Sequence, residues 1–532
     1  MMMPARPGRL LGLAFVLAVC LSGAGCGLER PLPQGSPAYA ARPLSKPEGK
    51  ENAGPTVGTA PAGRQERSSP DLPFVRVGPT KRYFQSEDGK PFFAIGHNEW
   101  PARLSINLES LQSIDAYLRN MQEHGENVLR VIADSEHVPV ENPPGTFNPV
   151  FKANLDALVQ AAERHGIYLQ IAMWPNVFNL PTSGFWFGWA KHPYNKKKGG
   201  PVAEFEGLFR DPAAWKLQEG RIRFFVDNWG GRASVFAWEI ANEFNYTNRD
   251  DWINHMSEYC RKYEDSKYGR AHLVCISTTA STVGTPQNAQ WSSPHLDFAT
   301  FHSYGKQDLP TGNRIGPVNP LQESLAIPKI VRRVSERAPG RPLLDCEMPG
   351  VVHGSRRLLL GRGAGDEAFT EMFLTSGLAY VCSGAAGSGF RWASNPVFQV
   401  DGAPNALSEK MYQYQLAIRR FTDQVDWNKM DPLPYDAIQL ESPGKRDQAN
   451  SISIVAKDRR RVVGMVLCAL AAKDALQVEV RFSGLSSEPH RVRWFETRSG
   501  NEIKSETPEG ASFALTTPSF VGHVAFVVEP KD

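Results

Sequence analysis

Short apolar runs alternate with longer stretches of helical spacing between residues 75 and 421. The apolar runs are rich in β-branched and aromatic residues, and they are apolar on both faces, which is typical of buried parallel strands. Eight such runs begin at Phe92, Asn127, Ile167, Val235, His272, Asp297, Pro342 and Ser388. The stretches with helical spacing are 111–124, 150–165, 212–229, 252–268, 321–337, 367–378 and 407–421. Eight strands alternating with helices predict an α/β fold, a (β/α)8 TIM barrel.

The pattern changes after about residue 432. Short runs of alternating polarity follow one another, separated by Gly, Ser, Pro and charged turns, which predicts a small antiparallel β-sandwich domain. These runs are 451–456, 462–468, 476–482, 490–495, 512–515 and 521–528. Two roles for this domain stay open, a structural accessory beside the barrel and a carbohydrate-binding domain. Near the other end, Asp88-Gly89 between apolar runs predicts a β-hairpin.

The first 70 residues carry targeting signals rather than a fold. Arg6 and Arg9 precede an apolar segment from Leu10 to Leu21, and small residues lead to Cys26. This layout predicts a secretory signal peptide over residues 1–26, either of the ordinary cleaved type or of the lipoprotein type with Cys26 lipidated. Residues 27–70 are rich in Pro, Gly, Ala and charge, which predicts a disordered linker. We therefore expect a barrel domain at 71–431, a β-sandwich at 432–532, and an exported protein, secreted or held at the cell envelope.

Charge and cysteine content limit the classes of partner and cofactor that we expect for this protein. The 532 residues include 59 Lys and Arg against 56 Asp and Glu, so the formal charge of +3 gives no electrostatic reason to expect nucleic acid, or a membrane beyond the lipid anchor. The seven cysteines are scattered without a CxxC pair, which argues against a disulfide framework and a zinc site. The first strand reads Gly96-His97-Asn98-Glu99 and lacks the His-x-His of metal-dependent barrel hydrolases. We expect no metal, no cofactor and a monomer.

Two predicted strands end in carboxylates. In a parallel barrel the catalytic groups lie at the carboxyl ends of strands. In this chain Asn242 and Glu243 follow one predicted strand, and Glu347 ends another. Glu239 lies roughly 13 Å deeper at strand rise, so we expect it to be a partnered structural acid. Asp345, two residues before Glu347, is the rival of Glu347. Two carboxylates facing each other across a barrel mouth suit glycoside hydrolysis, in which one protonates the leaving oxygen and the other attacks the anomeric carbon or activates water.

Other polar and aromatic residues at strand ends are candidates for substrate binding. They are His97, Asn98, Arg130, Trp174, Asn242, His302, Tyr304 and Trp392. Trp392 offers a flat apolar face that can pack against a sugar ring, and His302 can orient a carboxylate or a hydroxyl. For Arg130 two interpretations are equally open, a buried structural partner and a substrate ligand. The aromatic residues between 178 and 194 could form a rim that grips a polysaccharide or only pack a long loop.

Four of these segments together resemble a known family. They are Trp238-Glu-Ile-Ala-Asn242-Glu243, His302-Ser-Tyr304, Leu344-Asp-Cys-Glu347 and Arg391-Trp392. They resemble the retaining glycoside hydrolases with a (β/α)8 barrel, most closely the cellulase and mannanase-like family, glycoside hydrolase family 5. The resemblance implies a carbohydrate substrate, with Glu243 as general acid/base and Glu347 as nucleophile. It also implies that Asn242 bonds the sugar 2-hydroxyl and that Tyr304 lies near the nucleophile.

One departure from the family concerns the third strand. The family often has a histidine at its end, where this chain reads Met173-Trp174-Pro175-Asn176. The identity of the sugar, the linkage and the choice between endo and exo attack therefore stay open. A noncatalytic carbohydrate-binding protein on the same scaffold is the alternative function, although a binding protein has no need of two opposed carboxylates.

Overall fold

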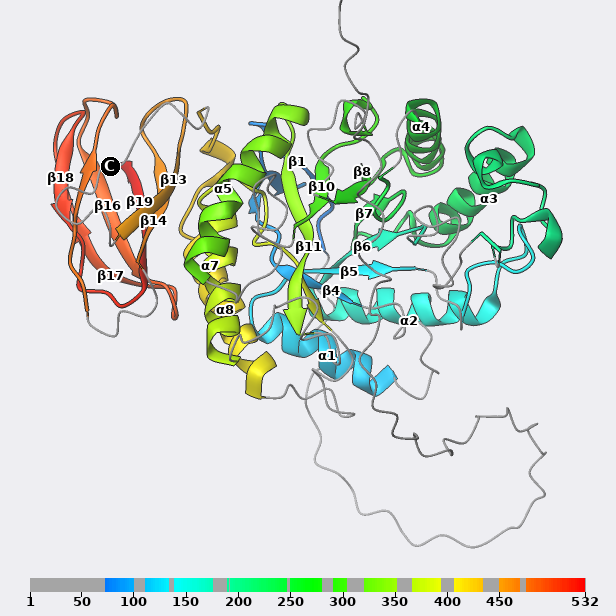
Figure 1. Ribbon diagram of the computed structural model, residues 1–532, viewed down its shortest axis with the longest axis horizontal. Helices are drawn as coiled ribbons and strands as arrows, with labels where there is room; N and C mark the ends of the chain where they lie inside the picture. Colours follow the sequence, from blue (N-terminus) through cyan, green and yellow to red (C-terminus); the bar gives the residue numbers. More distant parts are fainter. Residues whose placement is uncertain are drawn as a thin grey trace, which may run out of the picture. The chain divides into compact units, whose positions relative to one another are not determined.

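A computed structural model of the chain describes most of the residues from 72 onward (Figure 1). The described ranges are 72–99, 111–133, 138–175, 189–190, 192–245, 249–279, 290–303, 320–351, 366–393, 406–433, 449–468 and 475–531. The predicted signal peptide and linker lie outside them, as do most of the aromatic residues between 178 and 194. Of the helices in these ranges, none has the length and apolar character needed to cross a membrane.

A nine-stranded sheet forms the centre of the fold, and its neighbouring strands pair in parallel. Its strands are β4 (Gly96–Glu99), β5 (Val128–Ile132), β6 (Tyr168–Ala172), β7 (Val235–Glu239), β8 (Leu273–Cys275), β9 (Ser277–Thr279), β10 (Ala299–His302), β11 (Leu343–Val351) and β12 (Arg391–Ala393). Their order is β8-β7-β6-β5-β4-β12-β11-β10-β9. The two ends of this order, β8 and β9, are separated in the chain by the single residue Ile276. The predicted strand at His272 is thus present in two pieces.

Helices connect the strands and surround them (Figure 1). They are α1 (Leu111–Glu123), α2 (Pro149–His165), α3 (Pro212–Trp229), α4 (Asp250–Tyr268), α5 (Pro320–Arg337), α7 (Asp366–Val381) and α8 (Ala406–Thr422). Local chemistry sets several of their ends. Asn148 and Asp211 cap α2 and α3 by accepting from backbone amides, each helix then begins with proline, and Gly166 ends α2 with a φ of 65°. All seven helices predicted from apolar spacing are present.

An antiparallel hairpin precedes the parallel strands. Its strands are β2 (Phe84–Ser86) and β3 (Pro91–Phe92), with Gly89 at a φ of 85° in the turn, and β1 (Val75–Val77) pairs with the other edge of β2. Phe84 and Phe92 cross-pair, and their rings lie 5.1 and 5.7 Å from the ring of Phe236 near the start of β7. The hairpin is confirmed, but the predicted strand from Phe92 is wrong at its start. Residues 91–92 belong to the hairpin, and the parallel strand begins at Gly96, so the hairpin packs at the amino ends of the strands.

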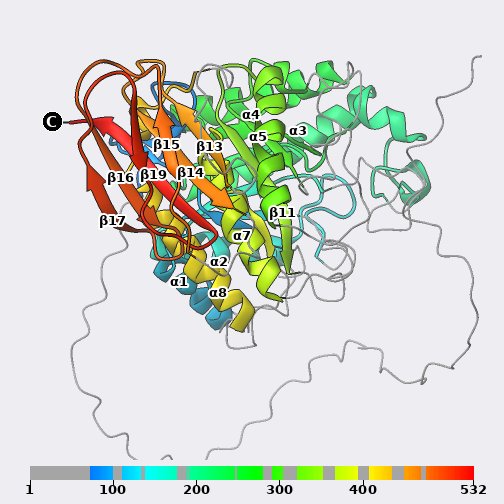
Figure 2. The same ribbon diagram turned by 60° about the vertical axis from the view of Figure 1, so that its left-hand side comes forward.

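Antiparallel strands make up the C-terminal part (Figure 2). A five-stranded sheet has the order β13-β14-β19-β16-β17, and β15 pairs with β18. The bounds are β13 (Ala449–Val455), β14 (Val462–Cys468), β15 (Glu479–Phe482), β16 (His490–Glu496), β17 (Asn501–Glu506), β18 (Phe513–Thr516) and β19 (His523–Pro530). The predicted strands are present. Strand β17 was not predicted, because its residues are polar apart from Ile503, which is itself exposed, and so carry no apolar signal.

The two faces of the five-stranded sheet bury different partners. Val466, Trp494 and Phe526 pack in a core of their own with residues of β15 and β18. Met465 and Phe495, which point to the other side, belong to the same apolar core as the helices around the parallel strands. The rings of Phe495 and Phe421 on α8 lie 5.2 Å apart. This shared core favours the structural accessory over an independent binding domain.

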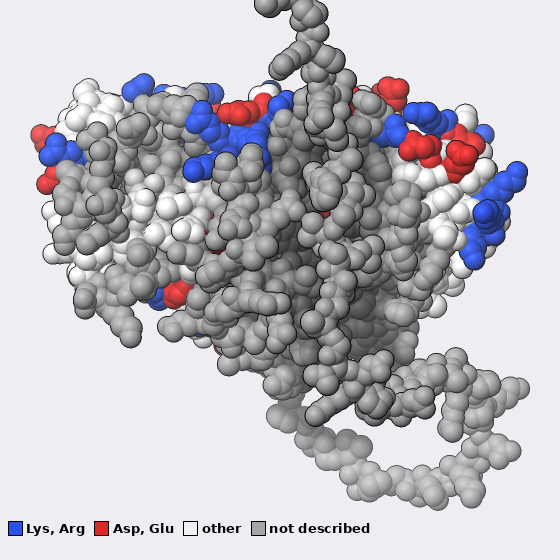
Figure 3. All heavy atoms as spheres, in the orientation of Figure 1, with Lys and Arg blue, Asp and Glu red and all other residues white. Residues whose placement is uncertain are grey.

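A polar cluster lies beside this apolar contact. Glu371 on α7 accepts hydrogen bonds from Arg498 at 3.0 Å, from His523 Nε2 at 3.3 Å and from Tyr414 at 3.1 Å. We call Glu371, Tyr414, Arg498 and His523 the α7 cluster. On the surface, the described charged side chains of the face in Figure 3 are mixed in sign, as the small net charge of the chain suggests.

Candidate active site

Arg130 on β5 is the centre of a hydrogen-bond network inside the parallel sheet. Its Nε and Nη2 each donate to Glu239 on β7 at 2.7 Å, which is the bidentate geometry of a strong ion pair. Both side chains have no exposed surface. Burial raises the pKa of Glu239, but the charge and hydrogen bonds of Arg130, with His302 and Ser277, together lower it, so this carboxylate stays ionised. Glu239 is therefore the partnered structural acid that the sequence predicted.

The other donors of Arg130 reach three more predicted residues. Nη2 donates to Asn242 Oδ1 at 2.6 Å, and Nη1 donates to Asn98 Oδ1 at 2.9 Å and to Glu347 Oε2 at 3.4 Å. Arg130 thus ties together the ends of β4, β7 and β11. Because it is fully buried and bonded to protein groups, these contacts favour the structural interpretation over that of a substrate ligand.

Glu243 and Glu347 face the same imidazole. His302 Nδ1 on β10 lies 3.0 Å from Glu243 Oε1 and 3.3 Å from Glu347 Oε2. One oxygen of each carboxylate and this nitrogen all lie within 4.8 Å of one another. The two carboxylates also keep some access to solvent, since the side chains of Glu243 and Glu347 are 15% and 6% exposed. The structure therefore brings together the two acids that the sequence placed on separate strands.

His302 carries a positive charge in this setting. Burial opposes the charge, but the carboxylate of Glu347, the neighbouring Cys346 and the bond to Glu243 together raise the pKa of His302 well above its ordinary value. Arg130 bonds to two carboxylates, those of Glu239 and Glu347, so a second cation is needed to balance the charge. His302 supplies that cation from beneath the two catalytic candidates.

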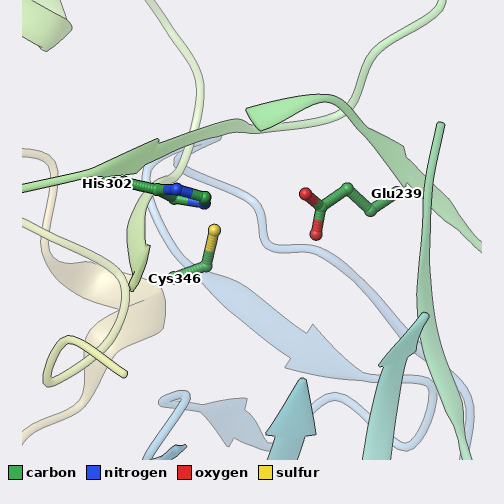
Figure 4. A group of neighbouring side chains, drawn as sticks. All are labelled: Glu239, His302 and Cys346. Atoms are coloured by element: carbon green, nitrogen blue, oxygen red, sulfur yellow. The ribbon is translucent and has the colours of Figure 1, made fainter. Parts of the chain in front are cut away.

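Figure 4 shows a second group that shares His302. Glu239, His302 and Cys346 point toward one another from β7, β10 and β11, with one ligand atom of each within 4.8 Å of the others. By residue type this group and the group of Glu243, His302 and Glu347 could each hold a metal ion. However, Arg130, Gln170 and Ser277 already donate to the oxygens of Glu239, and burial raises the pKa of the Cys346 thiol. Two protein cations already compensate the carboxylates, so the arrangement is that of an ion-pair network.

Asp345 does not share the surroundings of Glu347. Its carboxylate accepts hydrogen bonds from the hydroxyl of Tyr380 on α7 and from the backbone amides of Ser303 and Glu347, the latter two at 3.4 and 3.1 Å. Burial raises the pKa of Asp345 well above its usual range despite these bonds. A buried, protonated carboxyl is a poor nucleophile, so these contacts argue against the rival assignment.

Of the remaining candidates for substrate binding, two are buried against other protein groups and two lie outside the described residues. Trp174 is 3% exposed and lies beneath Arg221, whose guanidinium is 5.3 Å from its ring, so little of its face is available to a ligand. His97 is fully buried, with Nδ1 2.7 Å from Glu126 and Nε2 bonded to the hydroxyl of Tyr117. The prediction that His97 binds substrate is corrected here, because both of its nitrogens bond inside the protein. Tyr304 and the side chain of Trp392 lie outside the described residues.

Sequence reasoning missed Ser277. This residue begins β9, is fully buried, and donates to Glu239 Oε1 at 2.6 Å. Its hydroxyl also accepts from the backbone amide of Glu243 at 2.9 Å. No local motif marks it, since both partners are more than 30 residues away in the chain.

Known proteins resemble this chain in sequence and in fold. The chain matches the family model described as apiosidase-like, catalytic domain, over residues 79–428. It is 23% identical over 264 residues to mannan endo-1,4-beta-mannosidase 7 of Arabidopsis thaliana, a match that covers 44% of this chain and 59% of the relative. It is 28% identical over 169 residues to the probable mannan endo-1,4-beta-mannosidase A of Aspergillus clavatus, covering 28% and 43%.

Two solved structures show the same fold. One is titled glycoside hydrolase, with a TM-score of 0.58 and 15% identity, and the match covers 86% of this chain and 98% of that one. The other is a glycoside hydrolase family 5 protein from Bacteroides vulgatus, with a TM-score of 0.55 and 14% identity, covering 86% and 94%.

The sequence relatives confirm the resemblance to the cellulase and mannanase-like family. The chain spans about 60% of the length of the first curated relatives that it matches. The apiosidase-like match covers more than half of the chain, and the protein therefore belongs to the apiosidase-like family.

Proposed function

We propose that the protein is a retaining glycoside hydrolase that cleaves a β-linked glycan with Glu243 as acid/base and Glu347 as nucleophile. One observation carries the proposal, namely that an oxygen of Glu243 and an oxygen of Glu347 lie within 4.8 Å of each other around His302. Retaining enzymes hold their two carboxyl groups about 5 to 5.5 Å apart, whereas inverting enzymes leave roughly 6.5 to 9.5 Å for a water molecule. Because even the nearest oxygens have an upper limit of 4.8 Å between them, the arrangement supports the shorter spacing and direct attack by a carboxylate.

We also infer that the nine parallel strands form a closed (β/α)8 barrel. The first and last strands of the order, β8 and β9, follow each other across Ile276, and each pairs with a different neighbour, β7 and β10. Counted as one interrupted strand, they make eight strands with no free edge. Closure explains why residues from β5, β7, β10 and β11 meet at one point.

The proposed reaction has two displacements. A carboxylate oxygen of Glu347 attacks the anomeric carbon, the bond from that carbon to the leaving oxygen breaks, and the leaving oxygen takes the proton of Glu243. In the second step Glu243 removes a proton from water, whose oxygen attacks the anomeric carbon and releases Glu347. The sugar leaves with its original anomeric configuration, and Glu243 is protonated again.

His302 can follow the negative charge through this cycle. Before attack the charge lies on Glu347, and after proton transfer it lies on Glu243, while Glu347 has become an ester. His302 Nδ1 is within 3.3 Å of both carboxylates, so its proton can bond to whichever is ionised without a change of side-chain position. Fixed charges of this kind stabilise a transition state because they need no reorganisation.

The sugar class is proposed from the relatives. The sequence relatives are named for mannan, and the family model is named for apiosidases. We therefore place β-1,4-mannan and apiosyl glycosides first among the substrates to be tested, followed by glucans and xylans. The amide of Asn242 supports a role in sugar binding, since its oxygen is held by Arg130 and its NH2 group remains the donor for a hydroxyl.

The test separates the two acids. Glu243→Gln is expected to lower kcat/KM, which reports the first displacement, by about 10²- to 10⁴-fold on a phenyl glycoside, because its leaving group needs protonation, and far less on a dinitrophenyl glycoside. Glu347→Gly should be inactive and should regain activity with azide, which replaces the carboxylate as nucleophile. Asp345→Gly should gain nothing from azide.

Glu219→Gln on α3 is the matched control, since Glu219 pairs with His255 on the helical surface. It should keep the kcat of the parent enzyme on both substrates. Equal losses on both glycosides in Glu243→Gln, or rescue of the Asp345 variant by azide, would overturn the assignment.

A further inference from the structure

Ser277 forms hydrogen bonds with the backbone at Glu243 and on both sides of it. Besides the two bonds of its hydroxyl, to Glu239 and to the amide of Glu243, its backbone amide donates to Ala241 O at 3.2 Å and its carbonyl accepts from Phe244 N at 2.7 Å. One buried serine thus contacts the chain on both sides of the proposed acid/base.

Glu243 needs such support because its backbone is strained. Its φ of 48° lies in the left-handed region, which is rare for a residue other than glycine. A conformation of this kind costs on the order of 1–3 kcal/mol and persists only where the surroundings enforce it. Here the amide of Glu243 points at the Ser277 hydroxyl, and Gln290 Nε2 donates to the carbonyl of the next residue, Phe244, at 3.0 Å.

The hydroxyl of Ser277 is fixed by a charged partner. Its proton is directed to Glu239 Oε1 at 2.6 Å, so its lone pairs face the amide of Glu243. Hydrogen bonds in series polarise one another in a buried environment. The series runs from Arg130 through Glu239 and Ser277 to Glu243, while Arg130 also contacts Glu347 directly. The same arginine thus fixes both acids, one directly and one through Ser277.

We propose that Ser277 is a positioning residue that holds Glu243 in the strained conformation from which it donates its proton. The inference rests on the proposed function, since it assigns Ser277 to the acid/base of that reaction. Ser277 touches the acid only through its backbone amide, so it acts on the direction of the Glu243 side chain.

A graded series of substitutions tests the inference. Ser277→Ala removes both side-chain bonds, whereas Ser277→Cys keeps a weaker donor and acceptor of similar shape. We expect Ser277→Ala to lower kcat/KM on a phenyl glycoside by about 10- to 100-fold, as a small misplacement of a reacting group does. The kcat/KM on a dinitrophenyl glycoside should change little, and the kcat/KM of Ser277→Cys on the phenyl glycoside should fall between those of the Ala variant and the parent.

Ser257→Ala is the matched control, because Ser257 is equally buried and its hydroxyl bonds within α4. Thermal unfolding of all variants measures any general loss of stability. A merely structural serine would lower both glycoside rates together, through the amount of folded enzyme. Equal losses on the two glycosides, or parent-like kinetics in Ser277→Ala, overturn the inference.

The kinetics of the Glu243 and Ser277 variants distinguish an error in the inference about Ser277 from an error in the proposed function. If Glu243→Gln depends on the leaving group and Ser277→Ala does not, only the role of Ser277 is overturned. If Glu243→Gln itself shows no such dependence, the proposed acid/base fails first.

Discussion

His302 and His523 are both buried beside glutamates, but their pKa values are shifted in opposite directions. His302 faces Glu243 and Glu347 in the candidate active site, and its pKa is raised well above the ordinary value. His523 faces Glu371 in the α7 cluster, yet burial lowers its pKa more than Glu371 raises it. The difference is the surrounding balance of charge. Arg498 already neutralises Glu371, whereas Glu239 and Glu347 near His302 share one arginine.

The hydrogen bonds agree with these charges. Thr497 Oγ1 lies 2.5 Å from His523 Nδ1 and can donate to it, while Nε2 donates to Glu371, which is the pattern of a neutral imidazole. His302 instead directs one nitrogen at two carboxylates. A neighbouring glutamate alone therefore does not decide the charge of a buried histidine. The balance of the other charges around the histidine and the glutamate decides it.

The largest expected difference between the two regions concerns their arginines. Arg130→Met should lower the free energy of unfolding by about 3–5 kcal/mol, because it leaves Glu239 buried without a partner. Arg498→Met should cost about 1–3 kcal/mol, since the Arg498 side chain is 37% exposed and water can reach Glu371. Urea unfolding followed by tryptophan fluorescence measures both. Equal losses would mean that the two ion pairs do not differ in burial as described.

The histidines should differ in their effect on catalysis. His302→Gln keeps a donor but removes the charge, and we expect kcat on an aryl glycoside to fall about 10²-fold, as on loss of a preorganised charge-stabilising group. His523→Gln should leave kcat unchanged, because the α7 cluster contacts none of the described groups of the candidate site. Steady-state kinetics at neutral pH decide this, and a comparable loss in His523→Gln would contradict the separation of the two regions.

Glu371 gives a smaller effect with a defined pH window. Burial opposes its charge, but the bonds from His523 and Arg498 lower the pKa of Glu371 to about 2. A lowered carboxyl pKa gives stability that is present above the unfolded pKa of 4.5 and is lost as pH falls through about 2. Glu371→Gln should therefore cost about 1–2 kcal/mol at neutral pH, and the difference from the parent should shrink toward pH 2. A difference independent of pH in acid unfolding would count against this.

The smallest effects are the pH slopes of the two histidines, and they should have opposite signs. His302, with a raised pKa, stabilises the fold fully below the unfolded value of about 6.5, and this contribution is lost as pH rises through its folded pKa. His523, with a lowered pKa, stays neutral while the unfolded chain takes up a proton, so stability is lost as pH falls below about 6.5. Unfolding free energies of the parent minus each Gln variant, measured from pH 5 to 9, test this. Slopes of the same sign would refute the contrast.

Apolar patterning was enough to predict most of the fold. Helices such as 212–229 were found to the residue, because proline and an aspartate cap mark the start of α3 and its apolar spacing runs to Trp229. Glu243 and Glu347 were found because they follow apolar strands. These signals depend only on neighbouring residues in the sequence, and the predicted elements are present in the structure.

Side-chain direction at strand ends could not be predicted. His97 and Asn98 are adjacent in β4 and therefore point to opposite faces, with Asn98 bonding Arg130 and His97 bonding Tyr117. The sequence does not tell which of the two points inward. Asp345 and Glu347 are two residues apart, so regular alternation would place both side chains on one face of the strand, but their surroundings differ for another reason. The register with β10 shifts, so that Phe301 pairs with Asp345 and His302 with Glu347, which breaks the alternation that puts residues two apart on one face.

The shared apolar core has a consequence for the independence of the C-terminal sheet. One face of that sheet, with Met465 and Phe495, packs against helices α7 and α8. Transplanted to another protein, it would carry an uncovered interior, and the helices left behind would expose Phe421 in turn. The two parts are thus not interchangeable modules but halves of one hydrophobic interior, although the sequence pattern changes sharply between them.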